Sequence, residues 1–186
     1  MVTRTQYKLE EARFFLAHLE KDWRHVPQVD FYLSAFVSAA RSVTWVMKAE
    51  FGDLPGWTQW YESKKPSSAI RDLLKKMNEV RVRATKTEPL KTRTLANVTI
   101  PPEEVTPKVL AFLEAGAVGQ VRLEPIDPTN TVFSVKVDGE VLAKAHLKTS
   151  EHVLPEFQGR DSKDICREYL SELERLVSEC QAKFKP

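Results

Sequence analysis

The segment DFYLSAFVSAARSVTWVMKAEFG, residues 30–52, constrains the fold of this chain more than any other stretch. Between Phe31 and Met47 its residues are apolar or small on nearly every side of a helix, and Arg41 is the only charge there. We therefore expect this helix to be the central and most buried one, with a partner or a route to water for Arg41. Asp30 is expected to cap its start and Gly52 to close its end.

Helical spacing also marks the segments on both sides of this helix. Apolar residues recur on one face from about Gln6 to Arg24, and Pro27 then ends or interrupts the segment. After the turn GDLPG, the segment WTQWYES predicts a short aromatic helix, and PSSAIRDLLKKMNEV resumes the helical period. Because the connections between these four helices are short, we expect an antiparallel bundle over residues 5–95.

After about residue 95 the pattern changes from helical to extended. VTIPPEE and VGQVRLEPIDP each predict a short strand, TPKVLAFLEAG predicts a helix between them, and TVFSVKVDGEVLAKAHL predicts a hairpin over residues 131–147. A three-residue loop, Val137–Gly139, would pair Val135 with Val141 and sort apolar from polar side chains, so we prefer it to a two-residue Asp–Gly loop. The hairpin should pair with one of the two strands and lie against a helix, because a hairpin alone is marginal.

The chain closes with a long amphipathic helix over residues 161–184, whose apolar stripe ends at Phe184. Cys166 and Cys180 lie on this helix about 21 Å apart, too far for a disulfide, and are expected to be reduced core residues. The fold class expected is α+β, with an N-terminal antiparallel helical bundle, a small mostly antiparallel β-sheet and a long C-terminal helix. The expected domains are a helical bundle at 5–95 and a small β/α segment at 96–186.

Composition bounds the class of protein. The chain has 186 residues, of which 42% are hydrophobic and 29% charged, as in an ordinary folded domain. Its first residues lack the apolar core of a signal peptide and no apolar run approaches the length of about 20 residues that spans a bilayer, so we expect a cytoplasmic protein without membrane contact. No glycine-rich phosphate loop, zinc-type cysteine pairing or serine elbow occurs, and no cofactor is expected.

The net charge of +2 is unevenly distributed, since residues 64–93 alone carry +7. Within this region the segment VRVRATKTEPLKTRT is a candidate nucleic-acid-binding site, formed by Arg81, Arg83, Lys86, Lys91 and Arg93. The alternative is a solvated helix end whose basic side chains complement the negative C-terminus of the helix. The segment contains no aromatic residue on which a base could stack, which weakens the nucleic-acid interpretation.

Two other residue groups are candidate sites. His18, Asp22 and His25 have the i, i+4, i+7 spacing that can collect a divalent metal ion on a helix, although Pro27 follows closely enough to place His25 beyond the last regular turn. The aromatic residues of the first half could line a ligand pocket, but at helical spacing beside a small-residue helix they are typical of a core. This aromatic group comprises Trp45, Trp57, Trp60 and Tyr61.

Residues 5–95 resemble the HEPN superfamily of bacterial four-helix proteins in the order of their elements. The resemblance is carried by FYLSAFVSAARSVTWVM, by WTQWYE and by LLKKMNEVRVRATK, which leads to an exposed turn. Members of that family are often dimers, and the catalytic ones cut RNA with an Arg-x4-6-His motif near the end of the last helix. Here Arg81 stands at the position of the motif arginine, but positions 86 and 87 are Lys and Thr, and no histidine lies between His25 and His146.

That missing histidine decides the predicted function. Imidazole exchanges protons near neutral pH, and lysine does so only with a much depressed pKa, so the resemblance implies a member without catalytic residues. We predict a non-catalytic interaction or regulatory protein, a homodimer by resemblance, linked to bacterial defence or toxin–antitoxin function. The alternatives are a nucleic-acid-binding protein or ribonuclease that uses residues 81–93, and a protein with a small-ligand pocket among the tryptophans.

Overall fold

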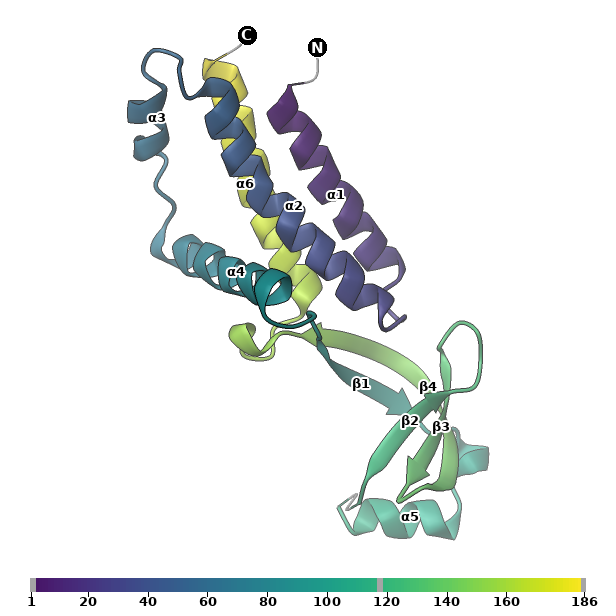
Figure 1. Ribbon diagram of the computed structural model, residues 1–186. Helices are drawn as coiled ribbons and strands as arrows, with labels where there is room; N and C mark the ends of the chain where they lie inside the picture. Colours follow the sequence, from purple (N-terminus) through teal and green to yellow (C-terminus); the bar gives the residue numbers. More distant parts are fainter. Residues whose placement is uncertain (1–2, 117–118, 185–186) are drawn as a thin grey trace. The chain divides into compact units, whose positions relative to one another are not determined.

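The computed structural model describes residues 3–116 and 119–184 (Figure 1). The chain forms two units: a helical unit, built from the chain up to Arg93 and from His152 onward, and a sheet unit, Thr94–Glu151. The chain first passes from the helical unit to the sheet unit after Arg93, near the expected boundary at residue 95. The predicted second domain, 96–186, differs from the structure, because the C-terminal helix belongs to the helical unit. Its long apolar stripe completes the core of the bundle.

The α+β fold class is confirmed, but the helices that form the bundle differ from the expected four, because α6 packs with α1 and α2. Figure 1 shows α1, α2 and α6 running alongside one another while α4 crosses them. The third long helix of the bundle is thus α6, from the end of the chain, and α3 is a short helix. The helices are α1 (Arg4–Lys21), α2 (Gln28–Phe51), α3 (Trp57–Ser63), α4 (Ser68–Lys86) and α6 (Ser162–Lys183), with a 3-10 turn η2 (Pro155–Phe157) before α6.

The core of the helical unit forms where α2 meets α1, α4 and α6. Phe36 of α2 is fully buried and its ring meets that of Tyr169 of α6 edge-on at 6.3 Å. The predicted stripe of α6 faces this core, and Cys166 and Cys180 are buried and unpaired with each other. Burial raises the pKa of both thiols. Within the described residues, no helix combines the length and the apolar character that crossing a bilayer requires.

The prediction that α2 is buried on nearly every side is wrong for one face. Phe31 is 66% exposed and Trp45 is 56% exposed. The small residues along this face are typical of a helix interior, but its two large rings remain more than half exposed. The prediction for Asp30 is also wrong: α2 begins at Gln28, so Asp30 lies inside the first turn. Its carboxylate instead accepts hydrogen bonds from Thr92, at 2.9 Å from the backbone N and 2.8 Å from the hydroxyl.

The first turn of α1 is capped from another helix. Glu50, near the end of α2, accepts from the backbone N–H groups of Arg4 and Thr5 at 2.9 and 2.8 Å and from the Thr5 hydroxyl at 2.6 Å. This carboxylate satisfies donors that a helix start leaves without intrahelical partners. Burial alone would raise the pKa of Glu50, but the hydrogen bonds from Thr5 and Arg4 outweigh it and the pKa is lowered.

We expect Glu50→Gln to lower the free energy of unfolding by about 1–2 kcal/mol at pH 7, because it removes a charge-assisted cap. A lowered pKa in the folded state means that the carboxylate stabilises the fold above its ordinary pKa and loses that effect as the pH falls through the folded value. Urea unfolding at pH 7 and pH 3 should therefore show a difference between wild type and variant that shrinks in acid. Glu79→Gln, on an exposed position of α4, should show no such difference.

The sheet unit surrounds one hairpin. Its elements are β1 (Arg93–Thr99), η1 (Pro102–Glu104), α5 (Pro107–Glu114), β2 (Val121–Pro125), β3 (Val132–Val137) and β4 (Glu140–Val153). The sheet order is β1-β4-β3-β2, so the hairpin of β3 and β4 pairs with both neighbouring strands that the sequence offered. Thr106 caps α5 as its sequence suggests. Val109 of α5 packs on Leu142 and Ala143 of β4, which gives the unit a small core of its own.

The prediction of a three-residue hairpin loop is wrong. Val137 pairs with Glu140, which leaves the two-residue loop Asp138–Gly139, with positive φ at both residues (49° and 90°). That is the geometry of a tight hairpin turn. A β-bulge opposite Val135 and Lys136 then shifts the register, so Val135 faces Ala143. The extra residue that the bulge adds to β4 places apolar side chains on one face and polar ones on the other. The three-residue loop was preferred for the same reason.

Candidate functional site

An exposed aromatic surface lies on α1 and α2. The ring of His18 lies between that of Phe14, with centroids 4.3 Å apart, and that of Tyr32, at 5.2 Å. Phe14 is 56% exposed, and Phe31 beside Tyr32 is also exposed. Ala35, Ser38 and Ser42 continue this surface along α2 at helical spacing. We call these seven residues the α1–α2 face.

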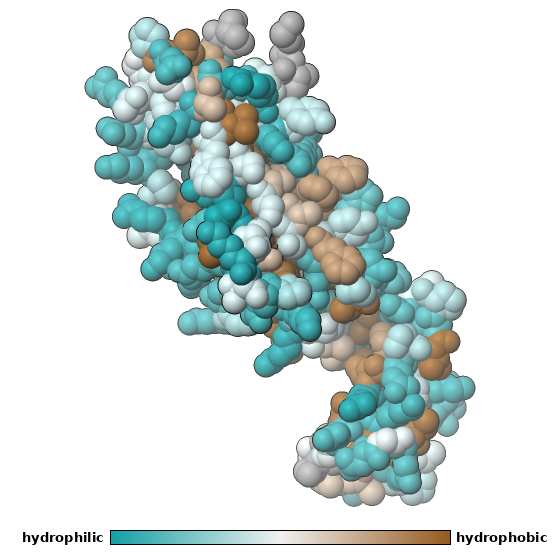
Figure 2. Space-filling model, viewed as in Figure 1, coloured by the Kyte–Doolittle hydropathy of each residue, from teal (hydrophilic) through white to brown (hydrophobic). Residues whose placement is uncertain are grey.

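Figure 2 shows brown hydrophobic and pale, weakly polar residues gathered over α1 and α2, with teal hydrophilic residues around them. The seven residues of the α1–α2 face include no Asp, Glu, Lys or Arg. A surface with several exposed aromatic rings and few charges is typical of an interaction site. The sequence signal for it was Phe14, which lies on α1 away from the core-facing residues Leu9, Ala12 and Leu16.

The five basic residues of the predicted nucleic-acid-binding site lie in different surroundings in the structure. Arg83 is occupied by carboxylates: its Nη2 lies 2.7 Å from an oxygen of Glu156 and its Nη1 lies 3.3 Å from one of Glu88. Lys86 and Lys91 are exposed at the end of α4 and in the following loop. Arg93 is exposed at the start of β1. Arg81 lies apart from these three, against Trp45 on α2. Binding of nucleic acid by the segment stays a prediction.

Arg81 and Arg41 meet on one indole ring. Their Cζ atoms lie 5.6 Å and 5.0 Å from the centroid of Trp45, within the range of cation–π contacts. Arg41 also donates to the Thr44 hydroxyl at 2.8 Å, which answers the need of this interior charge for a partner. Near the two arginines, Tyr169 is a side chain that could act as a base. Burial raises its pKa to about 12, even though the charges of both arginines act to lower it. Such a phenol holds its proton at neutral pH.

The aromatic group of the first half is divided. Trp57 and Trp60 are buried, as expected for a core, and Trp57 stacks on Tyr61 with centroids 4.8 Å apart. Trp45 is exposed, so the prediction that it belongs to the core is wrong. Beside Tyr61 lies a largely apolar cavity of about 250 Å³. Its lining includes Thr44, Leu74, Leu173 and Leu176, with Lys64 and Lys65 among the charged residues at its edge.

The three candidate metal ligands do not form a metal site. His18 is stacked between two aromatic rings. Asp22 follows the last residue of α1 as its C-cap, and His25 lies in the turn before α2. In the part of the chain that the structure describes, no three His, Cys, Asp or Glu side chains are grouped so that they could hold a metal ion. The regular helix that the spacing required ends before His25.

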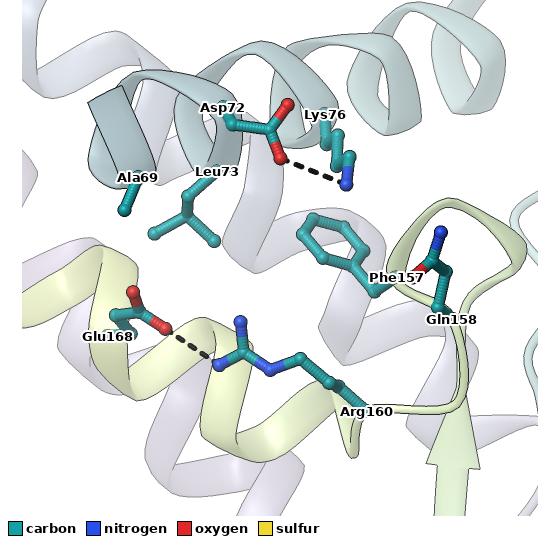
Figure 3. Close-up of a pocket in the computed structure, with 8 residues that line it drawn as sticks. All are labelled: Ala69, Asp72, Leu73, Lys76, Phe157, Gln158, Arg160 and Glu168. Atoms are coloured by element: carbon teal, nitrogen blue, oxygen red, sulfur yellow. Dashed lines mark hydrogen bonds and ion pairs between the residues drawn. The ribbon is translucent and has the colours of Figure 1, made fainter.

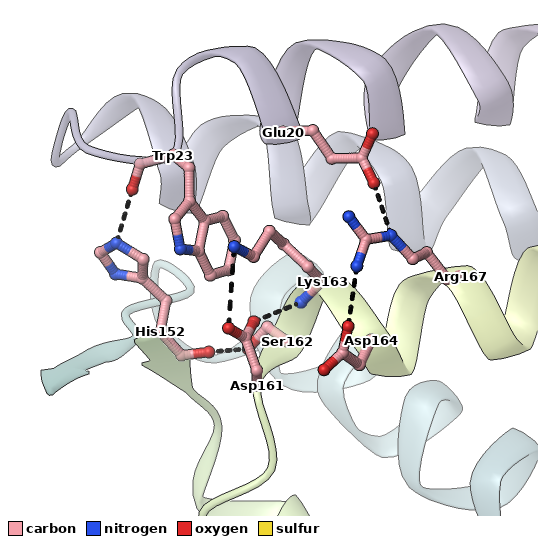
Figure 4. Close-up of polar contacts among 8 residues, drawn as sticks. All are labelled: Glu20, Trp23, His152, Asp161, Ser162, Lys163, Asp164 and Arg167. Atoms are coloured by element: carbon pink, nitrogen blue, oxygen red, sulfur yellow. Dashed lines mark hydrogen bonds and ion pairs between the residues drawn. The ribbon is translucent and has the colours of Figure 1, made fainter. Parts of the chain in front are cut away.

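A buried histidine anchors the chain where it leaves and re-enters the helical unit (Figure 4). His152 is 1% exposed; its Nε2 lies 2.8 Å from the carbonyl oxygen of Trp23, and its Nδ1 lies 3.3 Å from the Thr92 hydroxyl. Ser162 donates to the backbone carbonyl of His152. Burial lowers the pKa of His152, in part offset by the Trp23 hydrogen bond and by Asp30 and Asp161. The network is structural, because it is closed off from solvent.

A second cavity, of about 310 Å³, lies between α4 and the segment before α6 (Figure 3). Its charged groups are matched with each other: Lys76 pairs with Asp72 at 2.9 Å and Arg160 with Glu168 at 2.7 Å. The ammonium group of Lys76 also lies over the ring of Phe157. Since each of these four side chains has a partner within the lining, the cavity presents little unpaired polarity to a ligand.

No family model, curated protein or solved structure matches this chain. The evidence on function is therefore the α1–α2 face, the arginine pair on Trp45 and the two cavities of the helical unit.

Proposed function

We propose that this chain is a non-catalytic interaction protein of the cytoplasm that forms a homodimer through the α1–α2 face. The observation that carries the proposal is the exposure of Phe14 and Phe31 on adjacent helices, beside small residues that permit close approach. Large aromatic side chains supply much of the binding energy in protein interfaces. A HEPN-like relationship, in which members are often dimers, would agree with this role and with a link to bacterial defence, and both are part of the proposal.

A second copy of the chain suits this face for reasons of charge and size. In a two-fold dimer the same patch meets itself, so any net charge on it would repel its own copy. The α1–α2 face avoids this cost because it is almost uncharged. Along α2 the α1–α2 face runs about 17 Å, from Phe31 to Ser42, so a dimer with the standard area of about 800 Å² per partner would also bury the residues around it.

The absence of catalysis is supported by the surroundings of Arg81. Transfer of a proton near neutral pH requires a group that titrates there. Arg81 lies against Trp45, which it shares with Arg41, and its charge acts on the phenol of Tyr169, whose pKa is raised by burial. Elsewhere in the helical unit, His18 lies within the α1–α2 face, His25 lies between α1 and α2, and His152 is buried against Trp23. Cleavage of total RNA by wild type but not by Arg81→Ala would refute this part of the proposal.

Sedimentation equilibrium at about 10 μM tests the dimer. We expect wild type to show twice the 21.3 kDa mass of one chain. Phe31→Glu should weaken self-association at least about 30-fold, because it places a charge at the centre of a hydrophobic contact. Leu113→Glu is the matched control, since Leu113 is an exposed apolar residue of α5 in the sheet unit. A wild-type mass of one chain, or equal association of Phe31→Glu and wild type, would contradict the proposal.

A further inference from the structure

Two cations share one aromatic ring without a carboxylate to balance them. Among residues 3–116 and 119–184, neither Arg41 nor Arg81 forms an ion pair, and the buried Nε of Arg81 has no hydrogen-bond acceptor. Buried donors are nearly always paired in folded proteins. Arg83, two residues further along α4, shows the ordinary arrangement with two carboxylates. The arginine pair on Trp45 therefore has the charge and the free donor that an anion would satisfy.

The apolar cavity of about 250 Å³ is linked to this pair through Thr44 of α2, although neither arginine is part of its lining. Thr44, which accepts the hydrogen bond from Arg41, is part of its lining. On α6, Leu173 of the lining is one helical turn from Tyr169, whose phenol is close enough to both arginines for their charges to lower its pKa. The arginine pair and the cavity are thus connected through Thr44 on α2 and through Tyr169 and Leu173 on α6.

The other charged residues at the cavity are compensated or exposed. Glu172 is held by Arg175 at 2.6 Å, and Lys64 pairs with Glu179 at 2.7 Å. Glu62 and Lys65 are exposed at its edge and carry opposite charges. These groups leave the two arginines as the unbalanced charge next to the cavity.

We propose that the helical unit binds a small organic carboxylate with an apolar chain, whose carboxylate lies between Arg41 and Arg81 and whose chain enters the cavity. Guanidinium groups bind carboxylates through paired hydrogen bonds. The cavity has room for about eight non-hydrogen atoms, taking about 30 Å³ for each. The site uses none of the seven residues of the α1–α2 face, although Trp45 lies on the same side of α2, and it extends the function beyond self-association.

Calorimetric titration with octanoate, 1-octanol and acetate separates the two parts of the site. Octanoate carries both charge and chain, 1-octanol carries the chain and acetate the charge. We expect octanoate to bind at least about tenfold more tightly than either of the others, since charged hydrogen bonds and chain burial then act together. Equal binding of octanoate and 1-octanol, or no octanoate binding at millimolar concentration, would overturn the proposal.

Substitutions locate the anion. Arg41→Gln and Arg81→Gln should each weaken octanoate binding about tenfold and leave 1-octanol binding unchanged. Lys75→Gln, which removes an exposed charge from α4, is the control and should bind like wild type. Should either arginine variant fail to fold, the wild-type Nε–H NMR signal of Arg81 decides the matter. A shift of that signal on octanoate addition supports the site, and octanoate binding without a shift overturns it.

Discussion

His152→Ala is expected to lower the free energy of unfolding of the helical unit by about 3 kcal/mol at pH 7.5. The ring is almost wholly buried and meets the indole of Trp23 edge-on, with centroids 4.6 Å apart, so its removal leaves a cavity. The carbonyl of Trp23 also loses its hydrogen-bond donor. His152→Gln, which can still donate to that carbonyl, should lose less. Urea unfolding followed by circular dichroism measures both, and a loss below about 1 kcal/mol for His152→Ala would contradict the expectation.

The same residue should make stability depend on pH. Burial lowers the pKa of His152 in the folded state, whereas in the unfolded chain it titrates near the ordinary value of about 6.5. Its contribution is therefore complete above pH 6.5, falls as the pH drops from there towards the lowered pKa, and levels off below it. His152→Gln should flatten this part of the pH profile. His146→Gln, on an exposed position of β4, should leave it as in wild type.

Phe36→Ala is expected to lower the free energy of unfolding by about 4 kcal/mol, the largest effect predicted for this chain. Phe36 is fully buried at the centre of the bundle and packs on Tyr169, so its loss opens a cavity between α2 and α6. Leu54→Ala is the control, since Leu54 is 40% exposed and should cost less than about 1 kcal/mol. The two variants are compared by urea unfolding at one protein concentration. Similar losses would show that α2 is not the central helix.

Sequence periodicity predicted the helices and the hairpin, but β1 begins at Arg93, before the strand expected in VTIPPEE, and β4 continues past the expected hairpin to Val153. The apolar face of each helix faces the core, because burial of that face is what stabilises a helix in a folded chain. Periodicity could not predict which segments pack together. The small residues of α2 are equally compatible with a covered and an uncovered face, so the exposure of Phe31 and Trp45 did not follow from the pattern. The C-terminal helix was likewise assigned to the wrong unit.

The candidate sites were harder to predict than the fold because they depend on contacts between distant residues. Arg81 was singled out from a cluster of charges, but its contact with Trp45 and its proximity to Arg41 join α4 to α2. The hydrogen bond from Thr92 to Asp30 joins residues 62 positions apart, so no local sequence pattern could predict it. His18, Asp22 and His25 had suitable spacing, but the helix ends at Lys21.

The packing of α6 against α1 has a consequence for synthesis on the ribosome. Arg13 of α1 meets Glu174 of α6 at 2.7 Å, across nearly the whole length of the chain. Helices α1 to α4 and then the whole sheet unit must therefore be synthesised before α6, the last helix of the core, is translated. Until then the apolar side of α1 and α2 that packs on α6 stays exposed to solvent. We therefore expect the chain to depend on chaperones most at the end of its synthesis.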